Sequence, residues 1–355
     1  MILLDRTALG WDERFEQEFL PYMQKAWEPA RVISREFNQY TLAHENGLYA
    51  ASLSGKFLYH AQQGDLPVVG DWVAVERKNG CMVIHALVPR KTCFARKPAI
   101  SGGRKLKNGV IDGGITAKQA LAANIDTIFI VNGLDGNFST GRIERYLTIT
   151  AGSGASPVLL LNKVDLCEDI NEYTEALKTA APSVTAHAIS VKTGYGMEAL
   201  DQYLLPGKTV VFLGSSGVGK STIINSLFGE ELLATGEVSQ AHGKGRHTTS
   251  RAIMLCHRSG CMLIDTPGLR ELQLWCDEKA VEDSFADVVE AIGHCRFSDC
   301  GHKNEPGCGV RQAIADGTLP AVRYESYRRL YGEVWHLNAR RKQLEIALGR
   351  REKHR

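Results

Sequence analysis

Long apolar runs are absent from this sequence. No stretch reaches the ~18 consecutive apolar residues that a membrane-spanning helix requires. Residues 1–20 carry charged side chains, among them Asp5, Arg6 and Glu13, where a secretory signal would carry an apolar core. We therefore expect a cytoplasmic protein with no membrane span.

Cysteine is too sparse and too unevenly spaced for a disulfide framework. The chain has nine cysteines in 355 residues, and the odd number argues against complete pairing. Hydrophobic residues make up 44% and charged residues 23%, which is typical of two or three domains with a sizeable core.

Net charge is also small, at +2, but it is unevenly distributed. Residues 90–118 contain eight Lys or Arg and one acid, and residues 321–355 contain ten Lys or Arg and four Glu. Such windows make local positive surfaces on a nearly neutral protein. Solvated helix faces, a flexible linker and nucleic-acid binding are all compatible with this charge.

A Gly-Ser-Ser-Gly-Val-Gly-Lys-Ser-Thr string follows the apolar run 209–213 and precedes the helix-like stretch 223–228. An isolated Gly-Lys-Ser can be a surface turn, but this strand, loop and helix order fits a P-loop. Backbone N–H groups would face phosphate, Lys220 would place charge on the β and γ oxygens, and Ser221 would bind Mg²⁺. The predicted loop residues are Gly214, Ser215, Ser216, Gly217, Val218, Gly219, Lys220, Ser221 and Thr222.

The N-terminal part has a different texture. A helix is expected over residues 15–27, ending at Pro29. Five short β-type runs separated by glycines then suit an OB-fold barrel, with or without a nucleic-acid-binding role. The runs are 32–33, 40–42, 48–53, 72–75 and 82–84. A flexible Gly- and Lys-rich linker follows over residues 101–114.

Alternating apolar strands and helices from residue 125 onward indicate a parallel sheet with helices on both faces. One predicted strand, 158–161, ends in the guanine-reading pattern Asn162, Lys163, Val164 and Asp165. The Asp165 carboxylate can accept hydrogen bonds from guanine N1–H and its 2-amino group, which adenine does not offer in that arrangement. A later Ser190, Val191 and Lys192 resembles the companion loop that backs the base.

Two further segments suit the phosphate side of a GTPase. Thr249, or its neighbour Thr248, can bind Mg²⁺ in a switch, and Asp265 and Gly268 form an Asp-x-x-Gly that can reach the metal's water shell and the γ-phosphate. The next residue, Leu269, cannot orient the attacking water. His247 is the candidate for that role, although an ordinary exposed histidine, or His242, remains an alternative.

The order of these motifs is unusual. Asn-Lys-x-Asp precedes the P-loop, whereas ordinary GTPases place it after Asp-x-x-Gly. A circular permutation preserves the site, since sheet contacts depend on spatial neighbours. A helix over residues 197–204 is expected to join the old termini.

Cys295, Cys300, His302 and Cys308 lie within fourteen residues that include glycines and a proline. This density favours a closed Cys₃His zinc site, with His294 as an alternative to His302. Four protein ligands leave no open position, so one structural zinc per chain is expected and not a catalytic one.

Together these motifs resemble the circularly permuted GTPases of small-ribosomal-subunit biogenesis, the ribosome-dependent GTPase A family. The resemblance implies a multidomain fold: an OB-fold β-barrel, a permuted P-loop α/β domain and a zinc-binding, mostly α-helical domain. It also implies Mg²⁺-dependent GTP hydrolysis stimulated by the small subunit, late in its maturation. The expected divisions are a helical extension 1–30, barrel 31–92, basic linker 93–117, GTPase domain 118–272 and C-terminal domain 273–355.

The expected partners are GTP or GDP and the small subunit with its rRNA, bound by a monomer and without a membrane. Two other functions remain open. The chain could be a GTP-gated placeholder that hydrolysis only resets, or a permuted GTPase with a non-ribosomal partner.

Overall fold

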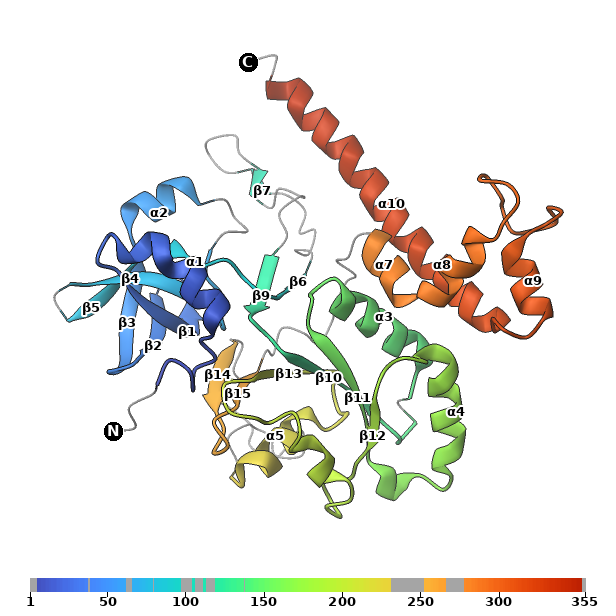
Figure 1. Cartoon of the computed structure of the whole chain (residues 1–355), viewed down its shortest axis with the longest axis horizontal. Helices are drawn as coiled ribbons and strands as arrows, with labels where there is room; N and C mark the ends of the chain where they lie inside the picture. Colours follow the sequence, from blue (N-terminus) through green and yellow to red (C-terminus); the bar gives the residue numbers. More distant parts are fainter. Residues whose placement is uncertain are drawn as a thin grey trace.

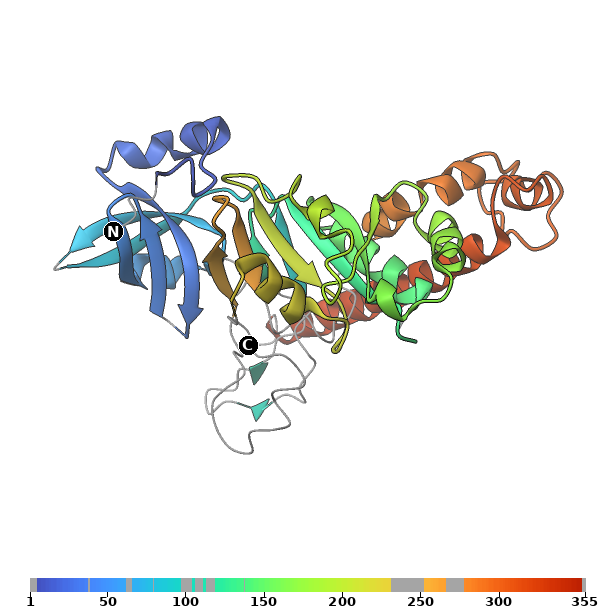
Figure 2. The ribbon, with the colours of Figure 1, turned by 90° about the horizontal axis from the view of Figure 1, so that it is seen from below.

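The computed structural model describes residues 5–37, 39–61, 66–78, 80–96, 104–105, 111–112, 119–136, 138–230, 252–265 and 278–352. A β-barrel, a central α/β sheet and a group of C-terminal helices lie in a row (Figures 1 and 2). Within these ranges, no helix has the length and apolar character needed to cross a bilayer.

The barrel closes because its first strand pairs with its second and also with its fourth. Its elements are β1 (Glu28–Glu36), β2 (Gln39–His44), β3 (Gly47–Leu53), α2 (Gly55–His60), β4 (Trp72–Lys78) and β5 (Cys81–Leu87). Val32, Leu42 and Met82 fill its interior. The predicted OB-like barrel is confirmed. Its first strand begins earlier than predicted, because Pro29 pairs with Ala74 within the strand and does not end a helix.

Helix α1 (Glu13–Met23) covers one part of this barrel. Asp12 caps it by accepting from the Phe15 N–H, which satisfies a donor that a helix start leaves unpaired. Its buried Phe15 and Phe19 pack with Trp11, whose ring centroid lies 4.7 Å from that of Trp72 in β4. The helix stops four residues before the predicted end at residue 27.

A strand pair connects the barrel to the central sheet. It consists of the antiparallel strands β6 (Cys93–Arg96) and β9 (Gln119–Ala123). Two short strands that lie between them in the chain, β7 (Arg104–Lys105) and β8 (Ile111–Asp112), pair with each other. The sequence predicts linker from residue 93 to 117. The structure instead places residues 93–96 in a strand, because residues more than twenty positions away supply its hydrogen bonds.

The central sheet has the strand order β12-β11-β10-β13-β15-β14. Its strands are β10 (Thr127–Gly133), β11 (Ser156–Asn162), β12 (Ala186–Ala188), β13 (Thr209–Leu213), β14 (Ile253–Cys256) and β15 (Met262–Asp265). All run parallel except β14, which pairs antiparallel to β15 and touches β1 of the barrel at its other edge. Buried residues along β10 alternate between two cores, so both faces of the sheet are covered.

Helices α3 (Thr140–Ala151) and α4 (Ile170–Ala180) cover one face, and α5 (Lys220–Phe228) covers the other. Strand β11, which carries Asn162, and the P-loop strand β13 lie on either side of β10. The chain forms β11 before β13. This arrangement confirms the permuted order. The predicted joining helix over 197–204 is wrong: only a 3₁₀ turn, η2 (Met197–Leu200), forms, and buried Leu200 and Leu204 mark a compact turn.

The C-terminal part is helical, with α7 (Glu278–Ser284), α8 (Ala286–Gly293), α9 (Gly309–Ala315) and the long α10 (Ala321–Glu352). Buried Arg323 fixes the start of α10: it donates to Ala180 O at the end of α4 and to Ser284 O, and pairs with Asp287. From there α10 runs back along α7 and α3 (Figure 1).

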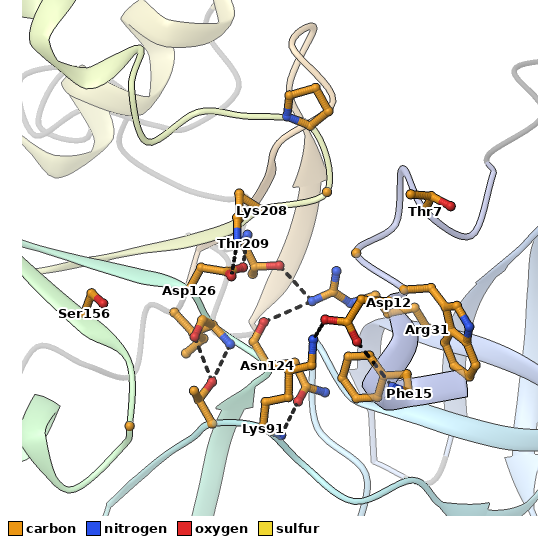
Figure 3. Close-up of a pocket in the computed structure, with 17 residues that line it drawn as sticks. Thr7, Asp12, Phe15, Arg31, Lys91, Asn124, Asp126, Ser156, Lys208 and Thr209 are labelled. Atoms are coloured by element: carbon orange, nitrogen blue, oxygen red, sulfur yellow. Dashed lines mark hydrogen bonds and ion pairs between the residues drawn. The ribbon is translucent and has the colours of Figure 1, made fainter. Parts of the chain in front are cut away.

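A buried arginine joins the barrel to the sheet beside a pocket of about 390 Å³ (Figure 3). Arg31 of β1 donates to Leu9 O, Gly70 O, Asn124 O at 3.2 Å and Thr209 Oγ1 at 2.8 Å. Burial lowers the pKa of Arg31 to about 10, with Asp126 and Asp71 opposing the shift. The side chain therefore remains charged at neutral pH and connects four separate segments.

Arg31→Met should lower the free energy of unfolding by about 2–4 kcal/mol, because it leaves several buried acceptors without a donor. Arg258→Met, at an exposed position between β14 and β15, is the matched control and should change it by less than about 0.5 kcal/mol. Urea titration of both variants measures the difference. Equal midpoints would show that Arg31 does not hold the junction.

Candidate nucleotide and metal sites

The loop after β13 has the glycine conformations that a phosphate cradle needs. Gly214 has φ +154°, and a Cβ there would lie 2.6 Å from Val131 O. Gly219 has φ +97°, and a Cβ there would lie 2.3 Å from Asn162 Nδ2. Both positions are closed to larger side chains, so the loop can pack tightly against β10 and β11.

Lys220 begins α5 and folds back over the loop. Its Nζ donates to Gly214 O at 2.8 Å and to Ser215 O at 2.7 Å. A lysine held at the centre of a loop in this way is placed to contact phosphate oxygens. Ser221 follows in the first turn of α5, and Asp265 ends β15, the strand next to β13.

Asn162 and Lys163 tie the guanine-reading segment to the P-loop. Asn162 Nδ2 donates to Val218 O at 2.9 Å, and Lys163 Nζ donates to Gly217 O at 2.7 Å. Lys163 also pairs with Asp135, in the loop after β10. The two motifs, which are far apart in the sequence, therefore form one rigid surface.

Asp165 lies in the 3₁₀ turn η1 (Val164–Leu166), with its side chain 15% exposed. Ser190 Oγ donates to Asp165 Oδ1 at 2.6 Å, and Lys192 Nζ lies 3.9 Å from Oδ2. The serine fixes the orientation of the carboxylate. The structure thus joins the predicted companion segment, residues 190–192, to the aspartate that is predicted to read the base.

Other predicted residues lie outside the described ranges. These are Thr249 and His247, with their alternatives Thr248 and His242, and also Gly268 and Leu269.

Four side chains from the loop between α8 and α9 meet in a cluster. The ligand atoms of Cys295, Cys300, His302 and Cys308 all lie within 4.8 Å of one another. His302 Nδ1 is 3.5 Å from Cys295 Sγ and 3.6 Å from Cys308 Sγ. Tetrahedral zinc with bonds of ~2.3 Å to sulfur and ~2.0 Å to nitrogen separates S and N by about 3.5 Å. The donor set therefore fits zinc, and the histidine in the cluster is His302 and not His294.

Backbone N–H groups at the start of α9 face the Cys295 thiol. Burial alone would raise the pKa of this thiol, but hydrogen bonds from the backbone N–H groups of Val310 and Gly309 lower it. Gly309 N lies 3.3 Å from Cys295 Sγ. No larger residue fits at Gly309, where a Cβ would lie 2.4 Å from Ala291 O.

Comparison with known proteins places this site in a family. A model of the family described as RsgA GTPase matches residues 89–275. Small ribosomal subunit biogenesis GTPase RsgA of Opitutus terrae is 42% identical over 92% of this chain and 89% of its own length. The chain belongs to the RsgA GTPase family. The protein of the same name from Methanosarcina acetivorans is 39% identical, over 98% of this chain and 89% of its own length.

Solved structures agree with this RsgA family fold. The crystal structure of YjeQ from Thermotoga maritima covers 87% of this chain and 99% of its own, with 27% identity and a TM-score of 0.63. YloQ, described as a circularly permuted GTPase, has a TM-score of 0.61 at 22% identity, which supports the fold alone. The chain is therefore a GTP hydrolase by family, and such enzymes use Mg²⁺ with the nucleotide.

Two side chains of this RsgA GTPase contact the P-loop region without having been expected from the sequence. Asp135 pairs with Lys163, and Arg142 donates to Ser215 Oγ. Both follow β10, a buried parallel strand whose carboxyl end meets the same sheet edge as the P-loop. That position was the available signal for Asp135, since polar residues directly after buried parallel strands collect at one edge.

Proposed function

We propose that this chain hydrolyses GTP on the small ribosomal subunit, late in the maturation of that subunit, and that the subunit stimulates hydrolysis. The relatives named above are biogenesis GTPases of that subunit by name and match most of this chain. The observation that carries the proposal is the joined guanine and phosphate surface, in which Ser190 orients Asp165 while Asn162 and Lys163 hold the P-loop.

In the proposed nucleotide site, different segments bind the base, the phosphates and Mg²⁺. Asp165 reads guanine, with residues 190–192 behind the base, and the P-loop holds the phosphates with Lys220 as the central cation. Ser221 and Thr249 would hold Mg²⁺, which when bound would neutralise charge on the β- and γ-phosphates. Asp265 orders the water around this ion, and Gly268 N–H contacts the γ-phosphate.

The proposed metal is one structural zinc per chain, held by Cys295, Cys300, His302 and Cys308. Sulfur and nitrogen donors at tetrahedral spacing support this choice over a hard cation such as Mg²⁺. Its role is to hold the loop between α8 and α9, and all four positions are filled by protein.

The proposed RNA contacts lie on the barrel and α10. On the barrel, Phe37 and Tyr59 are each 86% exposed, and the Arg77 guanidinium lies 4.7 Å from the Tyr49 ring centroid. Exposed aromatic rings beside cations can stack with unpaired bases. The basic C-terminal sequence over residues 340–353 adds charge that can bind phosphate. We take the protein to act as a cytoplasmic monomer.

Co-sedimentation of the full chain with small subunits in a sucrose gradient tests the partner. We expect the protein to travel with the subunit in the presence of a non-hydrolysable GTP analogue and to stay at the top with GDP. Migration at the top in both cases would point to a non-ribosomal partner. Single turnover per subunit, with no release, would favour a placeholder over a repeatedly acting GTPase.

His247→Ala tests the water-orienting role. This variant should bind GTP and subunit normally yet lose about 10²-fold of the stimulated rate, because a group that positions or deprotonates water contributes on that order. Phosphate release with and without subunits measures the loss, and His242→Ala is the matched control from the same segment. Full stimulation in His247→Ala would transfer the role to His242, the backbone or the RNA.

A further inference from the structure

The side chain of Arg142, in α3, forms a hydrogen bond with the P-loop. Arg142 Nη1 donates to Ser215 Oγ at 3.0 Å, across 73 positions of sequence. Ser215 is the second residue of the loop, and its carbonyl accepts from Lys220 Nζ. Two cations therefore fix the same loop residue, one through its side chain and one through its backbone.

Arg142 reaches the loop from a rigid base. Its backbone N–H donates to Ser139, the cap of α3. The next residue, Ile143, and Leu147 about one turn further on are buried in the core on one face of the sheet. The first turn of α3 is fixed by its N-cap and by its buried apolar face. If α3 shifts, the Arg142 guanidinium therefore shifts with it.

The C-terminal helix α10 holds α3 in turn. Arg145 Nη2 lies 3.0 Å from Glu333 Oε2, and Arg329 Nη2 lies 3.5 Å from Glu144 Oε2. The Glu144 side chain is 4% exposed, so this second pair is partly removed from water and less screened than a surface pair. Two ion pairs thus join α10 to the turn of α3 that follows Arg142.

Arg329 also lies directly against the start of α3. A Cβ on Gly141 would be 3.1 Å from Arg329 Nη2, so glycine leaves the space that this guanidinium occupies. Gly141 immediately precedes Arg142. Contacts therefore run without a gap from α10, through the first turn of α3, to Ser215 of the P-loop.

We infer that Arg142 is a positioning residue of the GTPase site and that α10 sets its position. The guanidinium holds Ser215 so that the loop keeps the shape that the phosphates require. A displacement of α10 moves the first turn of α3 and changes that shape. The inference depends on GTP hydrolysis alone and is independent of which partner binds α10.

Steady-state hydrolysis by the full chain tests the first step. Arg142→Met should lower kcat about tenfold, because small errors in loop placement are amplified in the transition state. KM for GTP should change less than about twofold, since Asp165 and Ser190 still hold the base. Arg142→Lys should recover part of kcat through one remaining donor. Lys178→Met, an exposed cation of α4, is the control and should leave both constants unchanged.

Ser215→Ala removes the same hydrogen bond from the loop side and leaves α3 intact. It should reproduce the fall in kcat seen in Arg142→Met. Full kcat in Ser215→Ala, together with a loss in Arg142→Met, would mean that Arg142 only stabilises α3, and the inference would be wrong.

A double-mutant cycle tests the step from α10. Arg329→Met, which changes none of the residues proposed to contact the nucleotide, should lower kcat about threefold in the wild-type background and have no effect in Arg142→Met, because both changes break one chain of contacts. Losses that multiply in the double variant would show independent effects and overturn the role of α10.

Discussion

Asp165→Asn should weaken GTP binding by at least about 100-fold. The carboxylate that accepts from two guanine donors becomes an amide with one acceptor, and a site built around a buried polar group rejects the wrong pattern strongly. Ser190 Oγ also loses a charged acceptor at 2.6 Å. Equilibrium titration with a fluorescent GTP analogue measures the change, and Asp201→Asn, an exposed carboxylate in the same sheet domain, is the control.

The same variant should gain relative affinity for xanthosine triphosphate, whose 2-oxo group accepts from the new amide. This gain separates a change in base recognition from simple damage to the loop. Unchanged GTP binding in Asp165→Asn would place the base elsewhere in the protein.

Cys300→Ser should abolish tight zinc binding and unfold the segment between α8 and α9. Metal binding to such a cluster is coupled to local folding, so loss of one ligand costs several kcal/mol. The wild-type chain should contain one zinc per protein by elemental analysis, and the variant close to none. Nucleotide affinity should stay within about twofold, because the cluster lies at the far end of the C-terminal helices from α5 (Figure 1).

Cys81→Ser is the matched control for the zinc variant, since Cys81 is an exposed free cysteine of the barrel. It should keep both the zinc and the melting curve of the wild type. A wild-type chain that is metal-free and melts normally would contradict the structural zinc.

Local pattern predicted the central elements well. The P-loop strand was expected over residues 209–213, and β13 is Thr209–Leu213; the strand that ends in Asn162 was expected over 158–161, and β11 is Ser156–Asn162. Apolar runs and helical spacing are properties of neighbouring residues, so these elements could be read directly. A cluster of Cys295, Cys300, Cys308 and a histidine was also expected from spacing alone, and these side chains do meet, because the loop that holds them is short.

Elements that depend on distant partners were missed. Strand β14 has four residues, and its place is set by pairing with β15 and by one contact with β1. Strand β6 takes its hydrogen bonds from β9, across the segment expected to be linker. The Arg142 contact with Ser215 depends on how α3 packs, which no short motif encodes.

The permuted strand order also affects how the nascent chain can fold. Strand β10 is made early, yet its neighbour β13 begins about 80 residues later, from residue 127 to residue 209. At ~5–20 residues per second, one edge of β10 stays without its partner on the order of 4–16 s during synthesis. An apolar strand with an open edge is prone to pair with other chains. This strand order therefore gives newly made chains a fixed interval in which the half-built sheet needs protection from aggregation.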